Sequence, residues 1–185
     1  MNYENMTRRR VLCFGDSNTY GYDPARDGRY GDDERYPMVL QDLLGDGWSV
    51  VEEGLPGRTA VFDDPITEGM NGLRVITPIL MSHAPLDTVT IMLGTNDQQA
   101  LATPDTTYRT ALASIVSWLR TLRAGADVAI VSVPENLSTT PGIVAMSQYR
   151  DAAQRAAFEN ACAFVDMWLV WGSSTAAFDG ASPRN

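Results

Sequence analysis

The chain has 185 residues, 44% of them hydrophobic and 20% charged, which fits one compact globular domain and argues against disorder or membrane spanning. Its formal net charge of -9 at pH 7 disfavours nucleic acids and anionic membranes as partners. All 14 positive residues are arginine and the only histidine is His83, which excludes lysine-based covalent chemistry and sites of several histidines.

The N-terminal residues and the cysteines indicate an intracellular protein. Residues 1–10 are polar, and the short apolar run before Gly15 predicts neither a signal peptide nor a transmembrane helix. The two cysteines, Cys13 and Cys162, are too few for a disulfide framework and lie in apolar surroundings, which favours reduced core thiols. We therefore expect a cytoplasmic location.

Short apolar runs alternate with helical patterns along the chain, as in βαβ units that build a parallel sheet. Five runs are apolar throughout, which is typical of strands covered on both faces: residues 11–14, 48–51, 89–93, 128–133 and 164–165. Helices are predicted at residues 37–44, 73–81, 104–124 and 147–161. The order predicts an α/β fold with a five-stranded parallel sheet in a single domain over residues 1–185, without repeats or linkers.

The clearest predicted helix lies between the third and fourth strands. Thr103 is in the N-cap position, Pro104 would be the first helical residue, and Gly125 follows the end. Its apolar residues recur at three- and four-residue steps: Tyr108, Leu112, Ile115, Leu119 and Leu122. We expect this face to cover the sheet.

In open parallel sheets, the loops at the carboxyl ends of the strands carry the ligand site. The first predicted strand runs into residues 15–18, a strand-to-helix turn that would lift the Ser17 hydroxyl out of the sheet. Such a hydroxyl suits a nucleophile, and the backbone N–H of Ser17 would help to bind an oxyanion. A second interpretation is that Asp16 and Ser17 simply cap the helix.

The next two strand ends offer hydrogen-bond donors. Gly57 has no side chain to block its backbone N–H, although a turn that needs a positive φ angle explains a glycine equally well. Asn96 brings a neutral carboxamide to the same edge of the sheet, and asparagine is also a common turn residue. Together the three strand ends predict an acyl-transfer site with a nucleophile and two further donors.

This arrangement resembles the SGNH (GDSL-like) hydrolase superfamily of serine esterases and lipases, whose signature positions correspond to Ser17, Gly57 and Asn96. Five segments are most similar to its arylesterase/acyltransferase branch: residues 14–17, 52–55, 58–59, 85–87 and 91–97. The resemblance covers nearly the whole chain. It implies a flavodoxin-like three-layer α/β/α sandwich, no metal or organic cofactor, and a homo-oligomer. We expect supporting roles for Asp16 and Asp97, and the short Gly- and Asp-rich loops favour small ester substrates over long lipids.

The sequence departs from the family at the catalytic base. Family members carry the acid and base in a D-x-x-H motif, often D-G-x-H-P-x-N, near the C-terminus; residues 179–185 here read DGASPRN. Asp179 would orient the base, but Ser182 stands where the histidine is expected, and a serine hydroxyl cannot take the Ser17 proton near neutral pH. A final helix also normally follows this motif. We expect its absence to expose apolar surface, and so to cause self-association, reduced stability or binding of a partner.

Other groups are poor substitutes for the missing histidine. His83 precedes the third strand whereas Asn96 follows it, which puts the imidazole about 20 Å from Ser17 by strand length. We therefore expect a structural role for His83. Asp179 could act directly only if burial raised its pKa well above about 4.

Two functions remain open from the sequence. One is a serine carboxylic-ester hydrolase, or an acyltransferase, that acts on small esters through an acyl-enzyme on Ser17. Loss of the base would weaken it to the residual ~10³–10⁴-fold acceleration that an oxyanion hole and binding supply. The other is a pseudoenzyme that keeps the pocket for binding or scaffolding. A natural loss of the histidine, an unrecognised base, and an altered or incomplete copy would each explain Ser182.

Overall fold

The computed structural model of the protein describes four stretches of the chain: residues 8–64, 66–99, 103–134 and 145–171. The predictions for Asp179, Ser182 and the end of the chain lie outside these residues. The centre of the fold is a five-stranded parallel sheet in the order β4-β1-β5-β6-β7. The strands are β1 (Arg9–Gly15), β4 (Trp48–Gly54), β5 (Thr88–Met92), β6 (Asp127–Val131) and β7 (Ala163–Val165). All five predicted strands are confirmed, and their order is flavodoxin-like.

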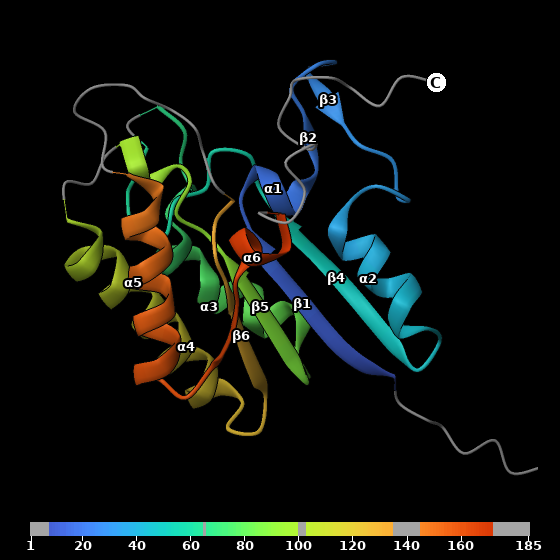
Figure 1. Ribbon diagram of the computed structural model, residues 1–185. Coiled ribbons are helices and arrows are strands. Elements are labelled where there is room, and N and C mark those ends of the chain that lie inside the picture. The colour runs from blue at the N-terminus through green and yellow to red at the C-terminus, as the bar shows by residue number, and fades with distance from the viewer. Residues whose placement is uncertain (1–7, 65, 100–102, 135–144, 172–185) are drawn as a thin grey trace, which may run out of the picture.

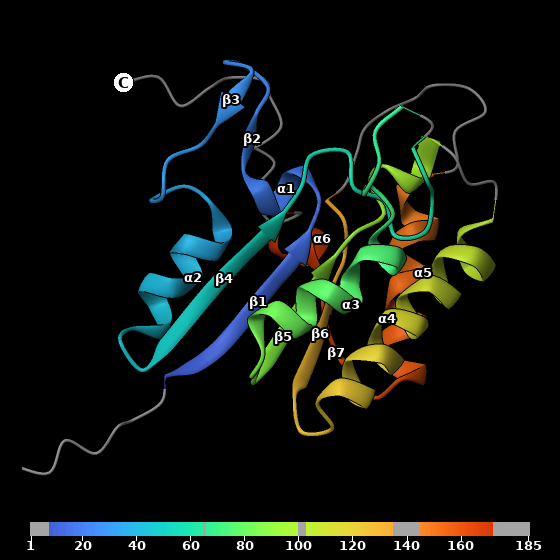
Figure 2. The same cartoon turned by 180° about the vertical axis from the view of Figure 1, so that it is seen from behind.

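Helices cover both faces of the sheet. Figures 1 and 2 show α3 (Gly72–His83), α4 (Arg109–Leu122) and α5 (Met146–Glu159) on one face, and α2 (Tyr36–Leu44) with the short α6 (Met167–Trp171) on the other. This division follows from right-handed crossovers, because the step from β1 to β4 runs opposite to the later steps. The three-layer α/β/α sandwich is therefore confirmed.

The face under α3, α4 and α5 holds the main core. The inward residues of α4 are fully buried over the central strands, as predicted for Leu112 and Ile115. Leu122 is 45% exposed, so its predicted place on the packed face is wrong; it is the last residue of the helix. Of the two free thiols, Cys13 is buried as predicted, whereas Cys162 is only half-buried.

The start of this helix also differs from the prediction. Thr103 precedes a π-helical turn, Pro104–Tyr108, and its side chain makes no capping hydrogen bond. The wider turn is closed instead by the backbone N–H of Arg109, which bonds the carbonyl of Pro104. The predicted side-chain cap at Thr103 is therefore wrong, although the helix begins where expected.

Residues 15–36, between the first predicted strand and the helix predicted from residue 37, contain additional structure. The four-residue helix α1 (Ser17–Tyr20) follows β1, and β2 (Tyr22–Asp23) pairs antiparallel with β3 (Gly28–Arg29). The longest described helices, α4 and α5, have 14 residues each, and none of the helices in the described stretches is long and apolar enough to cross a membrane.

Candidate active site

Ser17 is the first residue of α1, directly beyond the carboxyl end of β1. Asp16 caps this helix, since its Oδ1 accepts hydrogen bonds from the backbone N and the Nδ2 of Asn18, both at 2.9 Å. The Ser17 hydroxyl makes no hydrogen bond to any residue that the structure describes, and Ser17 lines a cavity. The capping role thus falls to Asp16 alone, and the Ser17 hydroxyl is left available for chemistry.

The position of Ser17 depends on a close approach between α1 and the end of β4. A Cβ atom at Gly54 would lie 2.1 Å from the backbone nitrogen of Tyr20, so only glycine allows this contact. The backbone N–H of Leu55 also donates to the carbonyl of Gly15 at 3.2 Å. These contacts fix the first two strand ends relative to each other.

Gly57 lies in the turn that follows β4. Its φ angle is 85°, a left-handed conformation that favours glycine, and the N–H of Arg58 closes the turn on the carbonyl of Leu55 at 3.0 Å. Gly57 is exposed, and its own N–H bonds to none of the described residues. The predicted turn with a positive φ angle is therefore confirmed, and the role of the accessible Gly57 N–H as an oxyanion donor stays a prediction.

Asn96 connects the end of β5 to the turn that carries Gly57. Its Nδ2 donates to the carbonyl of Arg58 at 2.9 Å, and the second amide hydrogen remains for another acceptor. Beside it, the Oγ1 of Thr95 accepts from the Nδ2 of Asn18 at 3.3 Å. Hydrogen bonds between their immediate neighbours therefore bring Ser17, Gly57 and Asn96 together at one edge of the sheet.

Asp97 is a buried carboxylate behind this edge. It accepts hydrogen bonds from the backbone N–H of Ala60 at 2.8 and 3.0 Å and from that of Val61 at 3.3 Å. Burial raises its pKa to about 6. Asp97 thus fixes the loop after β4 to the loop after β5, which agrees with the supporting role expected for it.

Arg58 and Asp16 are charged groups buried beside the site. Arg58 donates through Nη1 to the carbonyls of Gly15, at 3.1 Å, and Glu53, and its guanidinium lies 4.5 Å from the ring centre of Phe14. Burial lowers the pKa of Arg58 and raises that of Asp16. Among the described residues, the Nε of Arg58 and the Oδ2 of Asp16 have no hydrogen-bond partner. Sequence reasoning assigned Arg58 no role, although a charged residue beside a strand end was a usable signal.

His83 ends α3 and pairs with a strand residue. Its Nε2 lies 2.8 Å from Oε1 of Glu53, which is close to the carboxyl end of β4. The other carboxylate oxygen of Glu53 lies 3.9 Å from the Nη2 of Arg58. His83 thus has a carboxylate partner, in agreement with a structural role. Because Glu53 is near the carboxyl end of β4, the imidazole lies closer to that edge of the sheet than we expected for a residue that precedes β5. The described residues contain no cluster of three potential metal ligands.

A cavity of about 510 Å³ opens beside Ser17, between α1, α2 and the ends of the last three strands. Its lining side chains are mostly apolar or aromatic, and include Tyr36 and Leu40 of α2 and Val131 of β6. The volume is large enough for a small organic molecule. The nucleophile candidate is therefore placed at the wall of a ligand-sized cavity.

The similar proteins and structures that we describe next are lipases, acylhydrolases or esterases. The sequence profile of the GDSL-like Lipase/Acylhydrolase family matches residues 13–184. An acetylxylan esterase from Xylanibacter ruminicola is 36% identical over 92 residues, which are 49% of this chain but only 17% of that protein's length. The crystal structure of a carbohydrate acetylesterase family member from Sinorhizobium meliloti superimposes with a TM-score of 0.76 at 32% identity, over 85% of this chain and 82% of that one.

The aryl esterase of M. smegmatis is similar to the same degree, with a TM-score of 0.75 and 32% identity over 85% of this chain and 83% of that one. The family match, these two similar folds and the grouping of the three strand ends agree with one another. The chain belongs to the GDSL-like (SGNH) lipase/acylhydrolase family.

Proposed function

We propose that the protein is a serine carboxylic-ester hydrolase that acts on small esters through Ser17. The observation that carries this proposal is the unbonded Ser17 hydroxyl at the wall of a cavity, with Gly57 and Asn96 tied to the same edge of the sheet. The three relatives named as esterases support the same chemistry.

In the proposed reaction, the Oγ of Ser17 forms a bond to the acyl carbon, and the carbonyl electron pair moves to its oxygen. The backbone N–H groups of Ser17 and Gly57 and the side chain of Asn96 stabilise this oxyanion. Collapse breaks the ester C–O bond and releases the alcohol, which takes up a proton. Water then releases the acid from the acyl-enzyme, and a second alcohol in its place would give acyl transfer.

The proton of Ser17 needs an acceptor, and this is where the sequence limits the activity. Asp179 and Ser182 occupy the acid and base positions of the family motif, and serine cannot serve as the base. We therefore propose weak hydrolysis, carried by binding and the oxyanion donors. The same substitution favours the second candidate, a pseudoenzyme that binds esters without turning them over.

Hydrolysis of 4-nitrophenyl acetate separates the two candidates. The purified protein is compared with its Ser17→Ala variant, whose fold is checked by circular dichroism. A rate above that of Ser17→Ala, together with acetylation of Ser17 seen by mass spectrometry, supports the enzyme. Equal rates and no acetylation would leave the pseudoenzyme.

A homo-oligomer belongs to the same proposal. Val39 and Leu43 of α2 and Leu169 of α6 are exposed apolar residues, as expected for a surface that associates with another copy. Light scattering at several protein concentrations tests this, and a stable monomer throughout would contradict it.

A further inference from the structure

The wall of the cavity beside Ser17 is built from a segment with little regular structure. Gly21, Tyr22 and Tyr30 line the cavity from residues 20–35, and these residues include only the two-residue strands β2 and β3. So short a pair of strands is not stable by itself. Some other contact must hold this wall in place.

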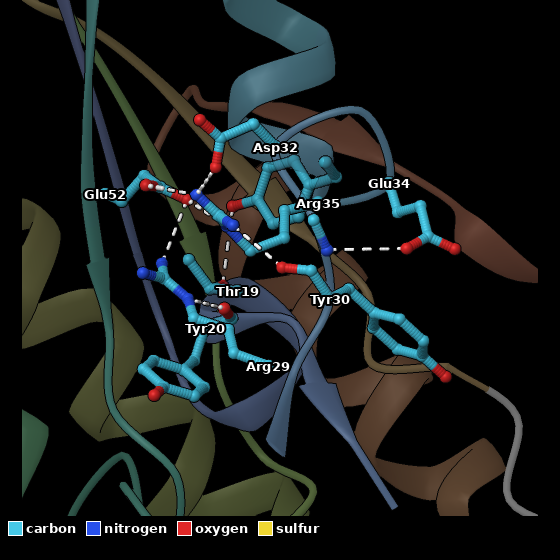
Figure 3. Close-up of polar contacts among 10 residues, drawn as sticks. Thr19, Tyr20, Arg29, Tyr30, Asp32, Glu34, Arg35 and Glu52 are labelled. Atoms are coloured by element: carbon cyan, nitrogen blue, oxygen red, sulfur yellow. Dashed lines mark hydrogen bonds and ion pairs between the residues drawn. The ribbon is translucent and has the colours of Figure 1, made fainter. Parts of the chain in front are cut away.

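Glu52 of β4 supplies that contact. Its Oε1 accepts from the Nε of Arg35 at 3.0 Å and from the Nη2 of Arg29 at 3.1 Å, and its Oε2 accepts from the Nη2 of Arg35 at 3.2 Å (Figure 3). The side chain of Arg35 is only 8% exposed and that of Glu52 19%, so this ion pair is largely shielded from water. Paired, shielded and bidentate charges of this kind fix geometry strongly.

The two arginines connect Glu52 to the backbone of the cavity wall, residues 20–35. Arg35 donates through Nη1 to the carbonyl of Tyr30 at 2.8 Å, and Arg29 donates through Nε to the carbonyl of Tyr20 at 2.7 Å (Figure 3). Tyr20 is the last residue of the helix that begins with Ser17. One carboxylate therefore holds both the cavity wall and the end of the nucleophile helix.

The same contacts decide the chemistry of the cavity. All three guanidinium nitrogens of Arg35 donate within the protein, since Nη2 also pairs with Asp32 at 2.6 Å. The hydroxyl of Tyr36 lies within 3.4 Å of Thr90 Oγ1. Glu34 and Tyr30 add polar atoms to the lining along residues 20–35, whereas the opposite side of the cavity is apolar: Leu40, Met92, Val131, Pro134, Val165 and Met167. Against this apolar side, the hydroxyls of a sugar would lack hydrogen-bond partners, which disfavours its binding.

We propose that Glu52 is a positioning residue for specificity. Through Arg29 and Arg35 it holds residues 20–35 as the wall of a cavity that takes the apolar group of an ester and rejects an acetylated sugar. This inference rests on the proposed function of Ser17, but it concerns binding and can be tested without turnover.

The experiment measures binding by ligand-observed NMR in a Ser17→Ala background, which cannot form the acyl-enzyme. The ligands are phenyl acetate, the larger 2-naphthyl acetate, and an acetylated methyl xyloside. We expect both aryl esters to bind and the sugar ester to bind at least about tenfold more weakly, a factor that corresponds to about 1.4 kcal/mol. Tighter binding of the sugar ester would overturn the proposal.

Adding Glu52→Gln tests the anchor. A loosened wall should weaken binding of phenyl acetate about tenfold and shift the preference toward 2-naphthyl acetate, whereas general destabilisation would leave the ratio of the two affinities unchanged. Glu159→Gln is the matched control, because Glu159 pairs with Arg109 on the surface at 2.6 Å and does not line the cavity. If Glu52→Gln fails to fold, Arg29→Met removes one contact of the same carboxylate and should shift the ratio in the same direction. An unchanged ratio in a folded variant contradicts the role of Glu52.

Discussion

The two faces of the parallel sheet are covered by different kinds of contact. Under α3, α4 and α5, the strand residues Val89, Ile91 and Ile130 are at most 1% exposed and belong to one continuous apolar core. On the face of α2 and α6, the alternate residues Thr88 and Thr90 are only half-buried, and the cavity beside Ser17 opens there. Because successive residues of a strand point to opposite faces, one sheet supports both environments.

The difference separates the residues that stabilise the fold from those that build the site. The α3–α5 face contributes apolar burial, the main source of stability, and carries few polar groups. The α2 face contributes the ion pairs of Glu52 and the largest cavity described. Substitutions on the two faces should therefore have distinct signatures, one in stability and the other in ligand binding and rate.

The largest expected effect concerns the site, and comes from restoring the base. Ser182→His should raise the rate of 4-nitrophenyl acetate hydrolysis by about 10²–10⁴-fold, the usual contribution of a general base, with little change in stability. The double variant Ser17→Ala/Ser182→His should lose the gain. No increase in a folded Ser182→His protein would show that more than the base is missing.

The next effect tests the apolar face. Leu112 of α4 is fully buried, so Leu112→Ala should lower the free energy of unfolding by about 2–5 kcal/mol in urea titrations. Met81→Ala, at a position 65% exposed on α3, is the control and should change it by less than about 0.5 kcal/mol. Equal losses in the two variants would contradict the stabilising role of the buried apolar core.

A smaller effect is expected at Asp97, as a dependence on pH. Burial raises its folded pKa from 3.8 to about 6, so the native state binds more protons than the unfolded state in this window and stability falls as the pH rises through it. Relative to Asp97→Asn, the free energy of unfolding of the wild type should therefore fall by up to about 3 kcal/mol between pH 4 and pH 7, at about 1.36 kcal/mol per pKa unit. The free energy of unfolding of both proteins, measured at each pH, gives this difference. A wild type that becomes more stable relative to Asp97→Asn as the pH rises would contradict the prediction.

The smallest effect is expected at the only histidine. His83 and Glu53 are both about a quarter exposed, so their ion pair should contribute less than about 1 kcal/mol. His83→Ala should leave the rate of ester hydrolysis unchanged in the wild type and in Ser182→His. A large loss of rate would instead make the imidazole the unrecognised base.

The sheet and the grouping of the site could be predicted from the sequence because each rests on a local pattern. Each strand contains a short, mostly apolar run, and residues that follow parallel strands must meet at one edge, which places Ser17, Gly57 and Asn96 together. The helix at residues 104–124 followed from its apolar period, whereas the short helices α1 and α6 were not predicted. Thr103 was misread because a capping residue type does not reveal that the next turn is π-helical.

The ion pairs could not be predicted, because they join residues whose spacing carries no signal. Glu52 and Arg35 are 17 residues apart on different elements, and strands as short as β2 and β3 have no measurable period. Likewise, the contact of His83 with Glu53 depends on the direction in which α3 crosses the sheet. A charged residue in a strand of the sheet, such as Glu52 of β4, is the one hint that a partner is needed.

Arg58 has a consequence for how the site would meet its transition state. Its side chain holds the carbonyls of Gly15 and Glu53, while its own carbonyl holds the carboxamide of Asn96. Hydrogen bonds of this one residue thus connect the ends of β1, β4 and β5 to one another in the absence of a ligand. Donors that are already oriented need no reorganisation when negative charge develops on the substrate oxygen. If the proposed function is correct, these contacts would therefore preorganise the oxyanion donors, whatever accepts the proton of Ser17.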